Sequence, residues 1–133
     1  MRLLSLLALS VVATSALSQN LLRNASFETN GGGNGQGLMP SEWMSTNASP
    51  DTYTNNGSFG LNPGDFGNFP GVTAQDGIAW VAGSSGVPES FGQVLTDGLV
   101  AGQEYTLTGW LHQALRSDPN TPGGYQIRLK TAT

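Results

Sequence analysis

The segment Glu104-Tyr-Thr-Leu-Thr-Gly-Trp-Leu-His-Gln113 is the longest β-strand candidate in the chain, because apolar and polar residues alternate along it. One set of alternate positions carries Tyr105, Leu107, Gly109 and Leu111, and the other carries Thr106, Thr108, Trp110 and His112. In a strand, alternate side chains point to opposite faces, so the first set is expected to face a core. The second set places an indole and an imidazole among hydroxyl groups, which suits a wet or ligand-facing surface.

Downstream, the segment Tyr125–Thr131 alternates in the same way and follows Ser117–Gly124, a turn signal rich in Pro, Asn and Gly. We expect its inward side chains to be Tyr125, Ile127 and Leu129, and its outward ones to be Gln126, Arg128 and Lys130. The sequence stops at Thr133, soon after this strand, which would leave its hydrogen-bonding edge unpaired. We therefore expect the domain to be truncated and to lack C-terminal strands, with edge protection by Arg128 and Lys130 as the alternative.

Upstream, short extended stretches alternate with turns rich in Gly, Asn and Pro. The strand candidates there are Asn20–Glu28, Pro40–Tyr53, Ile78–Ala82 and Ser90–Thr96. Together with the two later segments they predict about six or seven strands, spaced as in an antiparallel β-sandwich. The connection Asn55–Asp76 exceeds the usual loop length, and loops of that length are commonly functional or disordered.

The first 18 residues have the layout of a helical secretory signal peptide. Arg2 supplies a positive charge, Leu3–Ala13 is a short apolar run, and Ala16-Leu17-Ser18 offers small residues for cleavage before Gln19. The apolar run is too short to span a bilayer comfortably. Residues 1–18 are therefore expected to be removed, leaving one domain over residues 20–133 that is secreted, extracellular or held at the cell surface.

Composition narrows the classes of function. The 133 residues include 19 glycines and no cysteine, so the domain must rely on packing rather than on disulfides. Five basic and nine acidic residues give a net charge of −4, which repels polyanions and argues against nucleic-acid binding. No segment after the leader is apolar enough to cross a membrane.

Four short motifs occur in a recognisable order: Asn20-Leu-Leu-Arg-Asn-Ala-Ser-Phe-Glu28, Pro40-Ser-Glu-Trp43, Gln93-Val-Leu95 and Leu99-Val-Ala-Gly-Gln-Glu-Tyr-Thr-Leu107. Together they resemble the galactose-binding-like β-jelly-rolls, a group that includes family 4/9-type carbohydrate-binding modules and related secreted bacterial proteins of unknown function. Two positions depart from that pattern, since Ala25 and Glu42 stand where glycine is common. The resemblance covers residues 20–133 without the closing strands of the family.

The resemblance implies an all-β jelly roll with a structural calcium near the end of the first strand, where Glu28 would supply a side-chain ligand. The alternative is that Glu28 is a solvated or hydrogen-bonded carboxylate that closes the strand. The resemblance also implies that Trp43 lies in the core. The short apolar strand predicted over Ile78–Ala82 places Trp80 in the core as well. Trp110 is left as the tryptophan best suited to stack on a sugar.

We expect a non-catalytic protein that binds a polysaccharide or a cell-surface glycan through Trp110, His112 and Arg116. The alternatives are that His112 is a surface hydrogen-bonding residue and that Arg116 only pairs with Asp118. No hydrolase motif is present, and neither a second histidine nor a cysteine accompanies His112. The competing hypotheses are a structural or adhesive surface protein without a sugar site, and a gene fragment that does not fold stably.

Overall fold

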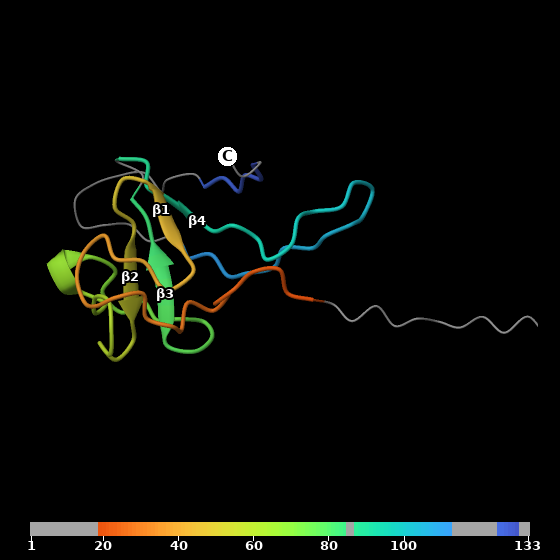
Figure 1. Cartoon of the computed structure of the whole chain (residues 1–133). Helices are drawn as coiled ribbons and strands as arrows, with labels where there is room; N and C mark the ends of the chain where they lie inside the picture. The colour runs from red at the N-terminus through yellow and green to blue at the C-terminus, as the bar shows by residue number, and fades with distance from the viewer. Residues whose placement is uncertain (1–18, 85–86, 113–124, 131–133) are drawn as a thin grey trace, which may run out of the picture.

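The computed structural model describes residues 19–84, 87–112 and 125–130, and its regular structure is all-β. The strands are β1 (Met44–Asn47), β2 (Asp51–Thr54), β3 (Ala79–Ala82) and β4 (Ser90–Gly92), with the 3-10 turn η1 (Asp65–Gly67) between β2 and β3 (Figure 1). The all-β prediction is confirmed at this level. The predicted leader, residues 1–18, lies outside the described residues. No helix of the described part is long and apolar enough to cross a bilayer.

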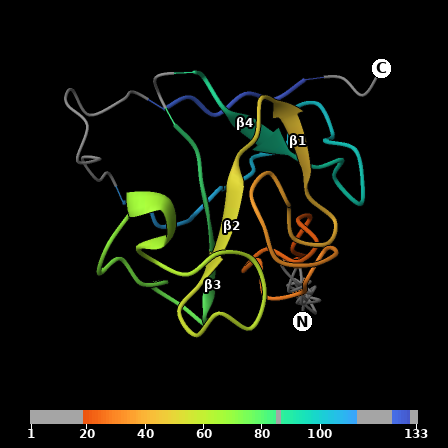
Figure 2. The same cartoon turned by 90° about the vertical axis from the view of Figure 1, so that its left-hand side faces the viewer.

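The strands form two antiparallel pairs, which Figures 1 and 2 show from two sides. One pair joins β2 to β3 in continuous register from Asp51 opposite Ala82 to Thr54 opposite Ala79. The other joins β1 to β4, with an irregularity between Ser45 and Asn47. The larger sandwich expected from the sequence, with its jelly-roll topology, stays a prediction.

The core lies around β2, whose central residue Tyr53 is fully buried. Its ring stacks on Trp80 of β3 with centroids 4.5 Å apart, and the Phe69 ring packs edge-on against both. Phe59 and Leu61 are also buried, and both come from the loop that follows β2. Trp80, predicted to lie in the core, stacks on the core residue Tyr53 but is itself only half-buried. Aromatic stacking and edge-to-face contacts stabilise beyond the area they bury.

A second aromatic cluster fixes the N-terminal segment against the β1–β4 pair. Trp43 packs against Phe27 and Phe91 at centroid distances of 4.9 and 5.6 Å, and its indole N–H donates to the Asn24 carbonyl at 2.9 Å. The structural role predicted for Trp43 is therefore observed.

The strand predicted over Asn20–Glu28 is wrong, because this segment forms turns. The Asn24 side-chain amide donates to the carbonyls of Thr29 and Ser41, and its oxygen accepts the Thr29 N–H. Asn24 and Phe27 both adopt positive φ, 44° and 66°. Asn is one of the few residues that tolerates this conformation, because its side chain can replace the strand hydrogen bonds with local ones.

The buried face predicted for residues 104–113 and 125–131 is also wrong for the described residues, which form no strand there. The side chains expected in the core are exposed: Tyr105, Leu107, Leu111, Tyr125, Ile127 and Leu129. Leu107 is 57% exposed and Leu129 76%. Alternation only says which residues can share a face. A strand also needs a neighbouring backbone, and no described backbone group forms a hydrogen bond with the backbone of residues 104–112.

Residues 93–112, which we call the arm, leave the body of the molecule as a long narrow loop on the side away from η1 (Figure 1). The first half is attached at its base. Gln93 exchanges two hydrogen bonds with the backbone of Arg23, and both the N–H and the hydroxyl of Thr96 donate to the Leu21 carbonyl. The two predicted sugar-contacting residues that the structure describes, Trp110 and His112, lie in the second half.

Candidate functional site

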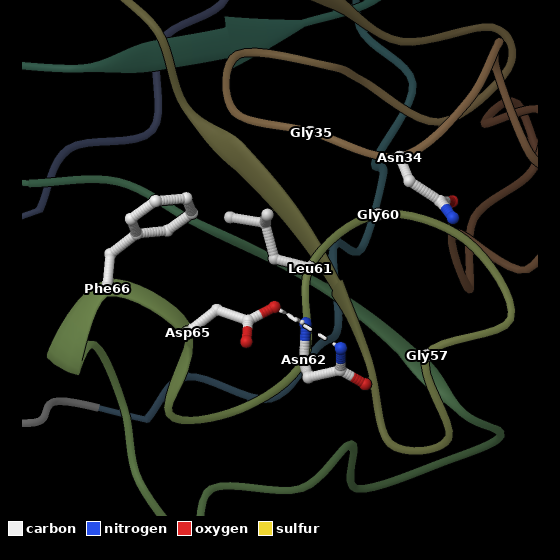
Figure 3. A pocket seen from close by; sticks show the side chains of 8 residues that line it. All are labelled: Asn34, Gly35, Gly57, Gly60, Leu61, Asn62, Asp65 and Phe66. Atoms are coloured by element: carbon white, nitrogen blue, oxygen red, sulfur yellow. Dashed lines mark hydrogen bonds between the residues drawn. The ribbon is translucent and has the colours of Figure 1, made fainter.

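A hollow of about 420 Å³ lies beside β2, between the glycine-rich loop near residue 34 and the loop that follows β2 (Figure 3). We call this depression the hollow, and we call residues 55–69 the β2 loop. The hollow is lined by Asn34, Gly35, Gly57, Gly60, Leu61, Asn62, Asp65 and Phe66. Glycine backbone, two amides, one carboxylate and one aromatic ring thus surround a single depression.

The β2 loop is held against β2 by backbone hydrogen bonds. The Leu61 N–H donates to the Thr52 carbonyl at 2.8 Å, and the Leu61 carbonyl accepts the Thr54 N–H at 2.9 Å. The Thr54 hydroxyl also donates to the Phe59 carbonyl at 2.6 Å. Gly60 makes this close approach feasible, because its φ is 68° and a Cβ there would lie 2.4 Å from the Thr52 carbonyl oxygen.

The glycine-rich loop on the other side of the hollow is fastened to the same strand. The Gly37 N–H donates to the Asp51 carboxylate at 2.6 Å, and the Thr52 hydroxyl donates to the Leu38 carbonyl at 2.7 Å. The Gly60 N–H reaches across to the Gly33 carbonyl at 3.2 Å. The two walls are therefore joined to one another as well as to β2, which preorganises the hollow.

A tight turn orients the polar groups of the hollow. One carboxylate oxygen of Asp65, Oδ2, accepts the backbone N–H of Asn62 at 2.7 Å and its side-chain amide at 3.2 Å (Figure 3). The Asn68 N–H donates to the Asp65 carbonyl, and Gly64 donates to the Asn68 carbonyl. No described residue donates to the other oxygen, Oδ1 of Asp65. A charged acceptor is thereby left available beside an amide of fixed orientation.

Phe66 presents its ring at the rim of the hollow. Its side chain is 67% exposed, and its φ of 54° lies in the left-handed region that is uncommon for a bulky residue. Such a conformation costs of order 1–3 kcal/mol and persists where the surroundings impose it, commonly at functional sites. In Figure 3 the ring extends toward the Leu61 side chain, and the Asp65 carboxylate extends toward Asn62.

Chemically, this lining suits a ligand that has both hydroxyl groups and an apolar face. Asn34, Asn62 and Asp65 offer donors and acceptors, and Phe66 offers a flat apolar surface. Only one lining residue is a carboxylate.

The predicted calcium ligand, Glu28, acts as a clamp between the N-terminal segment and β3. Its Oε1 accepts the backbone N–H groups of Ile78 and Ala79, each at 2.9 Å. Gly77 gives the carboxylate room, because a Cβ there would lie 2.2 Å from Oε1. No group of three or more His, Cys, Asp or Glu side chains suited to a metal occurs in the described part of the chain. The hydrogen bonds to Ile78 and Ala79 fit the alternative role, a hydrogen-bonded carboxylate, and the structural calcium at Glu28 stays a prediction.

Of the predicted sugar-contacting residues, Trp110 and His112 are both exposed on the arm, and Arg116 lies outside the described residues. The Trp110 side chain is 80% exposed, so it is accessible to a ligand. Its neighbours Leu107 and Leu111 are exposed as well, so the exposure of Trp110 does not distinguish a ligand-facing side from a core-facing one. Trp110 and His112 line a wide, open depression that the arm's Asp97, Gln103 and Glu104 also line.

Sequence reasoning identified the loop after β2 as long enough to be functional, but it did not single out Asn62, Asp65 or Phe66. The signal that could have found them is Asn62-Pro-Gly-Asp65, a turn sequence whose polar ends bond to each other, followed directly by an aromatic residue. That signal indicates an ordered turn. It does not by itself indicate that a glycine-rich loop lies opposite.

No protein-family model matches the chain. Searches against curated proteins and against solved structures likewise found no match. The resemblance to galactose-binding-like jelly rolls thus stays an expectation from short motifs, and the function has to be inferred from the geometry.

Proposed function

We propose that the protein is a secreted, non-catalytic carbohydrate-binding protein and that the hollow holds the sugar. The observation that carries the proposal is the placement of Phe66 beside Asp65 and Asn62. A pyranose ring has a C–H face that packs on an aromatic ring, and hydroxyl groups at its rim that bond to carboxylates and amides. The signal-peptide pattern of residues 1–18 and the resemblance of residues 20–133 to carbohydrate-binding modules support the same class of function.

The expected affinity is weak. Covering about 50 Å² of apolar surface on Phe66 contributes roughly 1 kcal/mol. A hydrogen bond to the Asp65 carboxylate contributes about 1.5–3 kcal/mol, and one to the Asn62 amide about 1 kcal/mol. These contributions total near 4 kcal/mol, and the lost translational and rotational freedom of the sugar must be subtracted from them, so a single sugar is expected to bind more weakly than a dissociation constant of about 1 mM. Useful retention on a polysaccharide then requires several sugar units or several copies of the protein.

Affinity gel electrophoresis through soluble neutral polysaccharides tests the proposal. Phe66→Ala is expected to abolish retardation, and Asn62→Ala to reduce it, while thermal unfolding followed by circular dichroism shows that each variant folds. Trp110→Ala is the matched control, because it also removes an exposed aromatic side chain. Retardation that survives in Phe66→Ala and disappears in Trp110→Ala would move the sugar site to the arm with His112. No retardation of the wild type in any polysaccharide would reject the function.

A second candidate function is a structural or adhesive role at the cell surface. It is favoured by the exposed apolar side chains of the arm, Leu107, Trp110 and Leu111, since exposed apolar patches mark interaction surfaces. This role predicts that Leu107→Ser and Leu111→Ser together weaken self-association or adhesion to a surface and leave sugar binding unchanged. Sedimentation of the wild type and the double variant at several concentrations separates the two candidates.

A further inference from the structure

We infer that the hollow selects saccharides that carry a free amino group, such as oligosaccharides of glucosamine. This inference rests on the proposed function, because it names the class of sugar that the same hollow takes. It begins with the charge of the lining. Asp65 is the single ionisable residue among the eight, and the lining contains no lysine, arginine or histidine.

Asp65 can accept a hydrogen bond from a ligand without losing the ones that shape the turn. Its Oδ2 is occupied by the two nitrogen atoms of Asn62. Its Oδ1 accepts no hydrogen bond from any described residue. A protonated amine on a sugar can donate to Oδ1. The carboxylate makes a hydrogen bond from a hydroxyl charge-assisted as well, so the amine gains over a hydroxyl by its ion-pair attraction to Asp65.

Phe66 adds a second element of ammonium recognition. Aromatic faces attract cations through the ring quadrupole, and this ring is largely exposed next to the carboxylate in sequence and in space (Figure 3). Neither element favours an N-acetyl group over a hydroxyl group.

The charge of the whole chain points in the same direction. Its net charge of −4 attracts cationic saccharides over a distance set by the ionic strength. Among the described basic residues, Arg23 is paired with Glu42 at 3.0 Å, and Arg128 and Lys130 do not line the hollow. A uronic acid would therefore meet the Asp65 carboxylate without a cation to offset the repulsion.

Two other ligand classes fit the hollow less well. A divalent cation prefers several oxygen ligands with more than one carboxylate, and the hollow has one. A purely apolar ligand would desolvate the Asp65 carboxylate and leave its Oδ1 without a hydrogen-bond donor, which is unfavourable. An amino sugar satisfies the carboxylate, the amide and the ring at once.

The test compares glucosamine trisaccharide with its fully N-acetylated form by titration calorimetry, in mildly acidic buffer where primary amines are protonated. Short oligosaccharides are used so that a polymer's total charge does not determine the result. We expect the amine form to bind up to about fivefold more tightly, which is the upper range for an exposed ion pair added to a hydrogen bond. In Asp65→Asn the two affinities should become equal, because the amide oxygen can still accept from Asn62 but carries no charge.

Glu104→Gln is the matched control, since it removes one exposed carboxylate from the arm. A preference for the amine form that survives in Glu104→Gln and disappears in Asp65→Asn supports the inference. A preference that falls equally in both variants, or remains in Asp65→Asn, overturns it in favour of general charge attraction. Equal binding of both trisaccharides by the wild type, with loss in Phe66→Ala, overturns the inference and retains the proposed function. Binding of neither trisaccharide, together with no retardation in neutral polysaccharides, overturns both.

Discussion

The β2 loop is more ordered and more buried than its sequence predicts, whereas the arm is less paired and more exposed than its sequence predicts. The β2 loop is rich in Gly, Asn and Pro, yet it buries Phe59 and Leu61 and bonds repeatedly to β2. The arm carries the clearest alternation of apolar residues in the chain, yet its described side chains from 104 to 112 are exposed throughout. Backbone partners account for the contrast. Two hydrogen bonds from Leu61 to β2 fix the loop, whereas the second half of the arm has no described backbone partner.

The largest expected effect comes from the core beneath the β2 loop. Tyr53→Ala removes a fully buried ring that stacks on Trp80, and we expect it to lower the free energy of unfolding by about 3–5 kcal/mol. Leu107→Ala on the arm should change it by less than about 0.5 kcal/mol, because that side chain is mostly exposed. Urea unfolding followed by circular dichroism measures both. Equal losses would show that the arm is packed in solution and would break the comparison.

Two glycines give a finer contrast. Gly60→Ala places a Cβ against the Thr52 carbonyl at a φ of 68°, and we expect a loss of about 2 kcal/mol. Gly109→Ala on the arm meets no described atom within 4 Å, and it should leave stability unchanged or raise it by up to about 1 kcal/mol. The same unfolding curves measure this pair. A neutral Gly60→Ala would mean that the loop does not hold its close approach to β2.

The Glu28 clamp should have an intermediate effect. Glu28→Ala leaves the N–H groups of Ile78 and Ala79 without their acceptor, at an expected cost of about 1–2 kcal/mol. Glu28→Gln keeps an acceptor oxygen and should cost about half as much. The melting temperature of the wild type is expected to be the same in calcium and in chelator. A clear rise with calcium that is lost in both variants would instead assign Glu28 to a metal site.

The smallest expected effect is a gain. Phe66→Gly relieves a positive φ, which costs about 1–2 kcal/mol for a residue with a Cβ, and the extra chain entropy of glycine removes about 0.5–1 kcal/mol of that benefit. We expect the variant to be more stable by about 0.5–1 kcal/mol and to lose sugar binding. Calorimetric melting and affinity electrophoresis on the same preparation measure the two effects. Loss of both stability and binding would indicate that the ring serves packing instead.

Part of the fold could be predicted from the sequence, and the reasons are local. The run Ile78–Ala82 lies between two turn signals, and β3 indeed occupies Ala79–Ala82. The failures at Asn20–Glu28 and in the arm have causes that the alternation of apolar and polar residues does not reveal. At Asn24 a side chain replaces strand hydrogen bonds with bonds to Thr29 and Ser41, and in the arm no neighbouring strand is described.

The candidate site could be predicted only as a loop. The length of Asn55–Asp76 and its turn residues indicated a functional connection. The hollow itself depends on the hydrogen bond from Gly60 to Gly33, which joins segments 27 residues apart in sequence. Neither the alternation of side chains nor the turn motifs predict a contact between segments so far apart in sequence. The orientation of Phe66 depends on a backbone conformation that aromatic residues rarely adopt.

The pairing of Leu61 with both Thr52 and Thr54 also bears on the solubility of the protein. It makes Leu61 a one-residue bridge alongside Tyr53, on a side of β2 that would otherwise offer free N–H and C=O groups to another chain. The loop that shapes the hollow thus also shields β2 from aggregation. Substitutions that loosen this loop to enlarge the hollow would therefore raise the risk of intermolecular strand pairing.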